Sequence, residues 1–583
     1  MSTAGARDGE ANGSAFWPKV RWLLVGLVLC RGVVDLCVLP PFEGWDEYQH
    51  VGYVEHVHQT GRTAVLWETS VSSALLAEVV KFPQPSISVK DQLKPLGAVD
   101  YARFWERHNP FEPGQAPPEF RGGSHALYQA QHSPLAYRMA APIYSALGGM
   151  KNLRMSVAGL RLANVALTAA AVWVVLTTLK RVMRDERDAA IVGFALAAHP
   201  LFLLNGARVA NDAIGVFLAS SAIAYCFSLI FTSQGARRFG VSCLGAGLLV
   251  GLAVTAKATN VGLVPFAAFA WFAAAVRGRL RVGQAVFAGA LMAAGCLVIV
   301  QTELRFNLAH YGSFTSMQEA VINRHKGVTQ ADVLRTASTF DWPATVSKLW
   351  SRELFLTGGW SFLLPYPKIV RVYREAVAVG LLGWVCWGAT ALVRRRKTLA
   401  SQTVFISWWV PLGCLVVVAS YTAGLAYHMI QSKLTWGVST TNPWYASAAL
   451  PWFLAMVVAG GISWPLGRWL RAAVPVTLAG AGLSAELIMI WGRMVPTYSG
   501  GATGLEALRR LAWLQPGFLG TATLALAFAA EVVVVALLVL VWRDSARGEE
   551  GNAEELIGQA PMEQRPWPRR RDRLEQRRCQ PAN

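Results

Sequence analysis

Long apolar segments, separated by shorter polar ones, run along most of the chain. A helix needs roughly 20 apolar residues to cross a bilayer, and a dozen segments approach that length. They cover residues 22–39, 157–179, 189–204, 213–232, 241–255, 259–276, 283–302, 374–393, 402–422, 446–463, 473–491 and 519–541. The pattern predicts an all-α polytopic membrane protein with about twelve transmembrane helices. Residues 241–276 also allow one long bent helix instead of two helices around Lys257.

The first apolar segment contains two charged residues. Arg31 and Asp35 are four positions apart and therefore share one face of a helix. Charges inside a span are costly unless they are paired or turned toward other helices. The spacing predicts a structural ion pair between Arg31 and Asp35.

The polar segments divide the chain into five parts. These are an N-terminus (1–21), a transmembrane module (22–302) that includes a large loop (40–155), a second loop (303–372), the C-terminal helices (373–541), and a basic tail predicted to be disordered (542–583). In the first loop, residues 133–147 are apolar but too short and interrupted to span. They predict a helix lying along the membrane surface.

The positive charge is distributed over the polar segments. The 583 residues carry a net charge of +19, and 54% of them are hydrophobic while 15% are charged. Lysine and arginine cluster at 180–187, 237–238, 277–281, 394–397, 468–471 and after 543. A cytoplasmic N-terminus places every cluster and the C-terminus in the cytoplasm, in accord with the positive-inside rule. A nucleic-acid interface is excluded, because its basic face would not be divided among loops between spans.

The segment PPFEGWDEYQH, residues 40–50, directly follows the first span. The span fixes the height of Asp46 and Glu47 above the bilayer. Such a carboxylate can act as a general base toward an incoming hydroxyl, and His50, one turn further on, can orient it. Alternatively, Asp46 caps a helix that begins at Glu47, with acidic residues in its first turn. The local sequence leaves both interpretations open.

Three further polar stretches face the same side in this topology. They are LFLLNGARVANDAIG with Arg208 and Asp212, TAKATN with Lys257, and YQAQHSPLAY with His132 and Tyr137. A structural explanation exists here too, because a tight outer turn needs polar residues and a lysine at the end of a span can snorkel to the interface.

Taken in order, these stretches resemble a known family. PPFEGWDEYQH resembles the first outer loop of GT-C superfamily glycosyltransferases, integral-membrane enzymes that use lipid-phosphate-linked sugars, in their bacterial protein-mannosyltransferase-like and aminoarabinose-transferase-like branch. QHSPLAYRMAAPIY resembles that branch's Pro-Pro-Leu-Tyr-Tyr element, and GLRLANVALTAAAVWVV its Arg-Leu-opened second span. HPLFLLNGARVANDAIGVFL resembles its acidic second outer turn with the flanking spans, and GLAVTAKATNVGLVPF its Thr-Lys span pair. NPWYASAALPW resembles its Arg-Tyr-x-x-Pro-x-x-Pro span start, with Trp444 where arginine is usual.

The resemblance implies a GT-C-type bundle whose large first extracytoplasmic loop contains juxtamembrane helices. It implies a bacterial plasma (inner) membrane protein with both termini in the cytoplasm. The reaction would move a sugar, with inversion, from a polyprenyl-phosphate donor to an extracytoplasmic glycan, lipid or protein acceptor. Asp46 would be the general base, positioned by Glu47 and His50. Glu47 could instead steady a metal, and Asp212 would bind sugar hydroxyls.

The leaving phosphate departs as an anion and needs positive charge near it. The residues that would bind substrate in this scheme are His50, Arg208, Lys257, His132, Tyr137 and Arg138. The cysteines show no metal-binding spacing, no cofactor is implied with certainty, and the use of a divalent metal stays open.

Two other functions stay open. A transporter or flippase for a lipid-linked saccharide fits the number of spans. Carriers, however, place polar residues near the bilayer midplane and often have paired halves, whereas the acids here gather at one surface. A non-catalytic scaffold of a glycan-assembly complex would leave Asp46 and Asp212 as helix caps.

Overall fold

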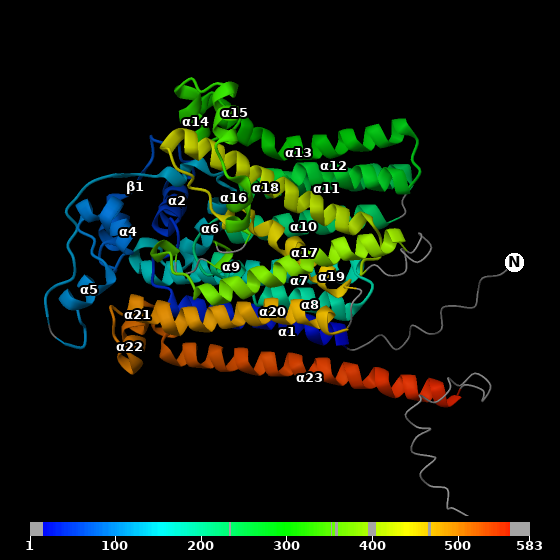
Figure 1. Ribbon diagram of the computed structural model, residues 1–583. Coiled ribbons are helices and arrows are strands. Elements are labelled where there is room, and N and C mark those ends of the chain that lie inside the picture. The colour runs from blue at the N-terminus through cyan, green and yellow to red at the C-terminus, as the bar shows by residue number, and fades with distance from the viewer. Residues whose placement is uncertain are drawn as a thin grey trace, which may run out of the picture.

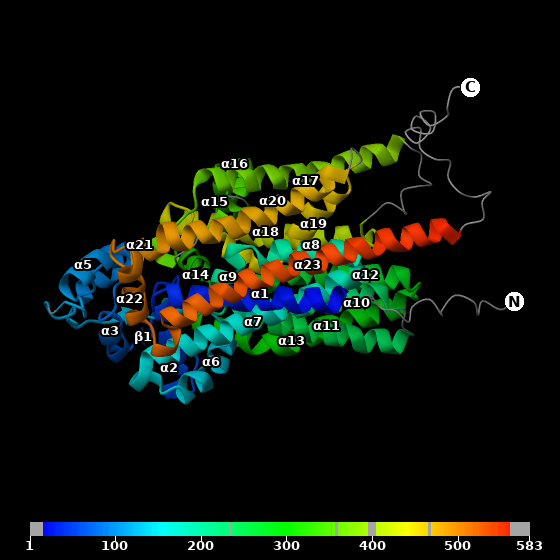
Figure 2. The same cartoon turned by 90° about the horizontal axis from the view of Figure 1, so that it is seen from below.

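The computed structural model of the chain describes residues 16–112, 114–232, 235–350, 353–355, 359–393, 404–464 and 468–559. The start of the N-terminus, the basic cluster 394–397 and the tail from residue 560 lie outside these residues. Long helices run side by side in one bundle (Figure 1). The elements α2 to α5 gather at one end of this bundle, opposite the start of α1 and the end of α23, as the view from below also shows (Figure 2).

The bundle contains most of the predicted spans. Its long helices are α1 (Phe16–Val38), α7 (Leu153–Val182), α10 (Asp212–Phe231), α11 (Ala236–Ala256), α12 (Leu263–Arg277), α13 (Val282–Tyr311), α17 (Pro367–Val393), α18 (Trp409–Trp436), α19 (Leu450–Ile462), α20 (Arg468–Met489) and α23 (Thr521–Gln559). Within the described residues, nine helical segments are long and apolar enough to cross a membrane. The chain is a helical polytopic membrane protein, as the pattern predicts. The predicted spans outside these nine are α1, α17 and residues 189–204.

The predicted span 189–204 is broken into two short helices. Helix α8 (Glu186–Ala197) ends before His199, and α9 (Pro200–Gly206) begins at Pro200. Proline lacks the backbone N–H and disfavours a helical conformation in the residue before it. The break leaves the carbonyl of Ala197 at an open helix end, where it accepts a hydrogen bond from Arg31.

The sequence predicted an ion pair between Arg31 and Asp35, and this prediction was wrong because Arg31 pairs with another acid. Arg31 is fully buried, and its guanidinium pairs with Glu486 of α20. Its Nε also lies 3.7 Å from Oε1 of Glu531 in α23. Both acids come from helices far away in the sequence, which the spacing along α1 cannot reveal. Arg31 therefore links α1 to α20 and α23 while it satisfies the open end of α8.

The first loop folds into a cap over one end of the bundle. Its elements are α2 (Glu47–Thr60), β1 (Ser70–Val71), α3 (Ser73–Val79), α4 (Ser86–Ser88), α5 (Tyr101–Arg107), β2 (His125–Ala126) and α6 (Leu135–Ala146). The two strands pair antiparallel, with Ser70 opposite Ala126. The apolar residues 133–147 form the predicted helix, which is α6. Fully buried side chains such as Tyr53, Leu75 and Phe104 give the cap its own core, which holds α2 in place.

Later segments complete this end of the molecule. They are α14 (Gln318–His325), α15 (Gln330–Ser338), α16 (Trp342–Leu349), the short helical turns Gly359–Ser361 and Pro443–Ala449, α21 (Val495–Tyr498) and α22 (Gly504–Leu514). Figure 1 places α14, α21 and α22 at the same end of the bundle as α2. At the opposite end, α23 continues beyond the predicted boundary at residue 541.

Candidate active site

Asp46 occupies the turn between α1 and α2. It stands at the N-cap position of α2, but its side chain makes no capping hydrogen bond, so the capping role considered from the sequence is not observed. Its backbone is left-handed, with φ of 58°, a conformation that aspartate and asparagine tolerate better than most residues. Oδ2 accepts a hydrogen bond from Gln129 Nε2 at 3.0 Å. Oδ1 is buried and has no hydrogen-bond partner within the described residues.

The surroundings of Asp46 favour its protonated form. Burial raises the pKa of Asp46 to about 7, and the charge of Asp212 also raises it, while Arg208 and the hydrogen bond from Gln129 act in the opposite direction. A carboxyl group that titrates near neutrality can exchange a proton with a substrate at physiological pH.

Glu47 is fully buried, and four donors surround its carboxylate. Arg161 of α7 binds it in a fork, with Nε 2.7 Å from Oε1 and Nη2 2.5 Å from Oε2. The backbone N–H groups of Val209 and Phe42 donate to it at 2.7 and 2.8 Å. Arg161 also donates to the carbonyls of Leu39 and Pro40 at the end of α1. These bonds occupy both oxygens of Glu47, so the carboxylate holds the turn together.

Arg208, Asp212 and Lys257 form a buried ion cluster beside this turn. Arg208 Nη2 lies 2.5 Å from Asp212 Oδ2, and Lys257 pairs with the other oxygen of Asp212. Arg208 Nη1 donates to the carbonyl of Trp45 at 3.1 Å, which connects the cluster to the residue before Asp46. Lys257 lies between α11 and α12, so residues 241–276 form two helices, as the first interpretation predicted. Two cations thus share one carboxylate next to Asp46.

Two stacked indole rings lie beside the ion cluster, and one of them is Trp444, at the position where the sequence resemblance led us to expect an arginine. The indole of Trp444 stacks on that of Trp45 with ring centroids 3.9 Å apart and planes 15° apart. The guanidinium of Arg208 lies 5.1 Å from the ring of Trp45. The carbonyl of Trp444 accepts a hydrogen bond from Lys257 at 3.2 Å. Trp444 therefore supports the two cations of the cluster instead of adding a third positive charge.

The predicted site residues His50, His132 and Tyr137 lie together in the first loop. His50 Nδ1 is 2.9 Å from the hydroxyl of Tyr137, and the rings of His50 and His132 are nearly parallel, with centroids 6.1 Å apart. Burial lowers the pKa of His50 well below its usual value and that of His132 to about 4, so both rings are neutral at physiological pH. Arg138 is exposed and donates to Thr63 at 3.3 Å. Of the predicted residues, Arg138 is the one that the structure places on an exposed surface.

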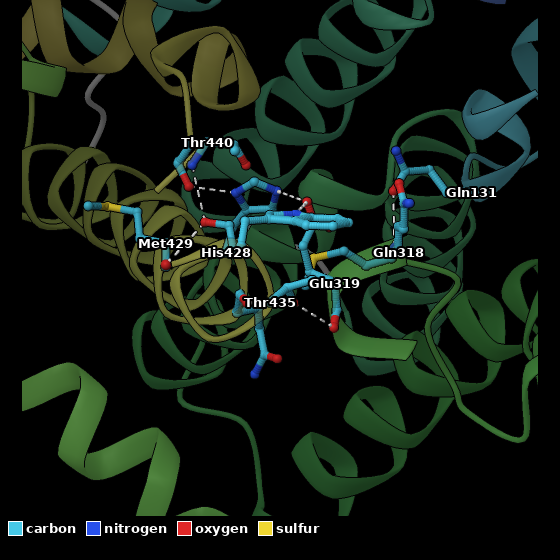
Figure 3. A network of polar contacts seen from close by, with 12 residues as sticks. Gln131, Gln318, Glu319, His428, Met429, Thr435 and Thr440 are labelled. Atoms are coloured by element: carbon cyan, nitrogen blue, oxygen red, sulfur yellow. Dashed lines mark hydrogen bonds and ion pairs between the residues drawn. The ribbon is translucent and has the colours of Figure 1, made fainter. Parts of the chain in front are cut away.

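Helix α14 connects the first loop to α18 (Figure 3). The backbone N–H of Gln318 donates to the side chain of Gln131 at 3.1 Å, one residue before His132. The next residue, Glu319, lies 4.0 Å from His428 Nε2, and its carbonyl accepts a bond from Thr435 at 3.3 Å. These contacts join three segments that are distant in the sequence and fix the second loop (303–372) beside the site.

Two residues at the centre of the site were not among the predicted site residues. Gln129 lies in YQAQHSPLAY, which was singled out for His132 and Tyr137, and Arg161 is the arginine of the Arg-Leu motif in the second span. The first stretch was noted as polar and the second for its resemblance, but the partners of Gln129 and Arg161, Asp46 and Glu47, are distant from them in the sequence. Within the described part of the chain, no group of three or more His, Cys, Asp or Glu side chains is arranged to hold a metal ion.

The chain matches no protein-family model and no curated protein sequence. Among solved structures it is similar to the oligosaccharyltransferase AglB of Archaeoglobus fulgidus in complex with an inhibitory peptide and a dolichol-phosphate, at 12% identity and a TM-score of 0.36 over 83% of this chain. It spans 56% of the length of AglB. It is also similar to ArnT of Cupriavidus metallidurans bound to undecaprenyl phosphate, at 12% identity and a TM-score of 0.29 over 79% of this chain and 78% of ArnT.

Structural similarity at 12% identity and TM-scores of 0.36 and 0.29 does not assign an activity to this chain. The activity is therefore inferred from the residues of the site.

Proposed function

We propose that this protein is an inverting membrane glycosyltransferase. It would transfer a sugar from a polyprenyl-phosphate-linked donor to an extracytoplasmic acceptor, which is a cell-envelope glycan, a lipid or a protein. The observation that carries the proposal is Asp46 Oδ1, a buried oxygen without a partner in the described residues, close to two buried cations. Leaving a buried acceptor unsatisfied costs about 1–3 kcal/mol, and a substrate hydroxyl would satisfy it.

In the proposed reaction Asp46 acts as the general base. Its carboxylate takes the proton of the acceptor hydroxyl while that oxygen attacks the anomeric carbon. The bond from the anomeric carbon to the phosphate oxygen breaks as the new glycosidic bond forms on the opposite face, so the configuration inverts. The polyprenyl phosphate leaves with the electron pair of the broken bond and needs no proton.

Arg208 and Lys257 are the groups we propose for the leaving phosphate. An arginine fork fits two phosphate oxygens, and a lysine supplies a point charge. Asp212 is buried and pairs each of its oxygens with one of the cations, so its role in the proposal is to hold both cations in place. A charge cluster of this kind, already organised before the reaction, stabilises charge that develops in the transition state.

Glu47 and His50 are proposed to position the base. The fork between Glu47 and Arg161 fixes the turn that carries Asp46. The neutral imidazole of His50, which lies one helical turn after Asp46, bonds to Tyr137 of α6. We propose an inner-membrane location in a bacterium, with an extracytoplasmic site. The basic clusters and the position of the cap opposite the start of α1 support this orientation.

The proposal is tested by comparing cells with and without the gene. Loss of the protein is expected to remove one sugar from an envelope glycan, lipid or protein and to cause a polyprenyl-phosphate-linked sugar to accumulate, both measured by mass spectrometry. Membranes that contain the protein should release free polyprenyl phosphate from that lipid in the presence of acceptor. Movement of the intact lipid-linked sugar across the bilayer without its cleavage would contradict the proposal and support a transporter.

One observation favours the transporter as a second candidate. Arg31, Glu486 and Glu531 lie buried between helices and residues 189–204 are broken, which are features that carriers use at membrane depth. In this chain, however, Arg31 is engaged by Glu486 and by the Ala197 carbonyl. This network supports the helix break, and the enzyme remains the proposal.

The activity is expected to depend on pH through Asp46. A general base works only when deprotonated, so kcat/KM should fall about tenfold per pH unit below the pKa of the base and level off above it. The pKa of Asp46, raised to about 7 by burial, places this acid limb near neutrality. A pH profile of polyprenyl phosphate release measures it. An acid limb near pH 4, the usual range of an aspartate, would contradict the base assignment.

Replacement of Gln129 by methionine is expected to move the acid limb to higher pH. The hydrogen bond from Gln129 lowers the pKa of Asp46, and methionine keeps a similar shape without the donor. The matched control is Gln84→Met, because Gln84 is a buried glutamine of the same loop that donates to the carbonyls of Val79 and Phe82. The control should leave the limb in place.

A further inference from the structure

Glu43 is a buried acid that the proposed reaction does not use. It lies three residues before Asp46, and its side chain is fully buried. Oε1 accepts a hydrogen bond from the backbone N–H of Ser361 at 2.9 Å, and Oε2 is bonded to the hydroxyl of Tyr101. Its own carbonyl accepts from the N–H of Trp360 at 3.0 Å. Glu43 thus joins α5 and the turn Gly359–Ser361 to the turn that presents Asp46.

The turn Gly359–Ser361 fits closely against Glu43. Gly359 has a φ of 52°, and a Cβ at this position would lie 1.9 Å from the carbonyl oxygen of Glu43. Past this turn, the ring of Phe362 lies 6.3 Å from that of Trp45. The close approach requires glycine at position 359, and it places the second outer loop directly on the residues before Asp46.

The charges around Glu43 favour its neutral form. Within the described residues it has no ion-pair partner, because Arg161 is engaged by Glu47. The other ionisable groups near it are the hydroxyls of Tyr101 and Tyr498. Burial raises the pKa of Glu43 to about 8, and the nearby charge of Glu47 adds to this effect, while the hydrogen bonds from Tyr101 and Ser361 oppose it. The bond to Tyr101 can form with the proton on either oxygen.

We propose that Glu43 is a positioning residue for Asp46, which as a neutral acid holds the turn Gly359–Ser361 and α5 against the turn that carries the base. Loss of its proton places a second negative charge beside Glu47 in a buried site and releases this docking. The inference rests on the proposed function where activity is the readout. Because the folded state binds the proton more tightly than the unfolded chain, this contribution to stability is full below about pH 4.5, shrinks as the pH rises, and is gone above about pH 8.

The test uses Glu43→Gln and Glu43→Ala in the full-length protein in lipid nanodiscs. Glutamine keeps the shape, accepts from Ser361 and donates to Tyr101 without a titrating proton. We expect the wild type to leave the plateau set by Asp46 and to lose kcat/KM above about pH 8, whereas Glu43→Gln should match the wild type at pH 7 and keep this value at higher pH. Glu43→Ala should lose about 100-fold in kcat/KM at every pH, because the base is no longer aligned. Glu55→Gln, another buried glutamate of the cap bonded to Ser72 and Gln59, is the control and should match the wild type.

A second readout does not depend on glycosyl transfer. Hydrogen exchange of the Trp360 and Ser361 amides, corrected for the intrinsic effect of pH, should become about tenfold faster between pH 7 and 9 in the wild type and stay constant in Glu43→Gln. If the wild type releases no polyprenyl phosphate at any pH, the proposed function fails, while the exchange rates still decide the role of Glu43. An alkaline limb that persists in Glu43→Gln, or pH-independent exchange in the wild type, overturns the inference.

Discussion

An Asp46→Asn protein is expected to keep its fold and to lose about 10²–10⁴-fold of its transfer rate, the contribution of a general base. Asparagine has the same size, tolerates the left-handed backbone of this turn, and still has an oxygen that can accept from Gln129. It cannot take a proton from the acceptor. Release of polyprenyl phosphate from the donor lipid by the purified variant measures the loss.

Asp91→Asn is the matched control, because Asp91 is an exposed aspartate of the same loop and should leave the rate unchanged. The elution volume in size exclusion and the unfolding temperature of both variants show whether the fold is kept. An Asp46→Asn protein that folds and keeps full activity would eliminate Asp46 as the base. That result would favour a non-catalytic role for the turn that carries Asp46.

Replacement of Arg161 by alanine is expected to lower the free energy of unfolding by about 3–5 kcal/mol, as when one partner is removed from a buried ion pair. Glu47 would keep its charge without the arginine fork, and the carbonyls of Leu39 and Pro40 would lose their donors. The same change should abolish activity, since these bonds fix the turn that carries Asp46. Chemical denaturation in mixed micelles measures the free energy.

Lys180→Ala on the same helix provides the contrast. Lys180 pairs with Glu186 at 2.7 Å, but both side chains are largely accessible, at 44% and 32% exposure. A surface pair contributes about 0–1 kcal/mol, so this variant should unfold close to the wild type. Equal losses for Arg161→Ala and Lys180→Ala would show that the buried fork does not stabilise the turn.

The fold could be predicted from the sequence to the level of helices. The apolar segments predicted a helical membrane protein, a helix at 133–147, which is α6, and two helices around Lys257. Residues 189–204 show the limit, because their apolar pattern continues through the break at Pro200. The partner of Arg31 was wrong because helical spacing reports only neighbours on the same helix, whereas Glu486 and Glu531 come from other helices.

The location of the site could be predicted from the sequence more fully than the set of residues that form it. Asp46, Asp212 and Lys257 stand out because charged residues are rare beside apolar spans, and Asp212 and Lys257 are indeed paired. Gln129 is uncharged and carries no such signal, and the charges of Arg161 and Glu43 do not indicate which residues they contact. Their importance arises from contacts to Asp46, to Glu47 and to the turn at Ser361, and none of these partners is their neighbour on a shared helix.

Apolar periodicity and charge are local properties, since hydrophobic transfer and helix formation depend on residues that are near one another in the chain. The sequence by itself therefore determined that the chain is a bundle of membrane helices with acids and bases at one end. Three things distinguish the carboxylates: which is held by an arginine, which accepts from a backbone N–H, and which keeps an oxygen without a partner in the described residues. These depend on donors from α7, from the first loop and from the second loop (303–372). The tertiary structure alone decided this, because hydrogen bonds and burial assign different roles to chemically identical groups at Glu43, Asp46 and Glu47.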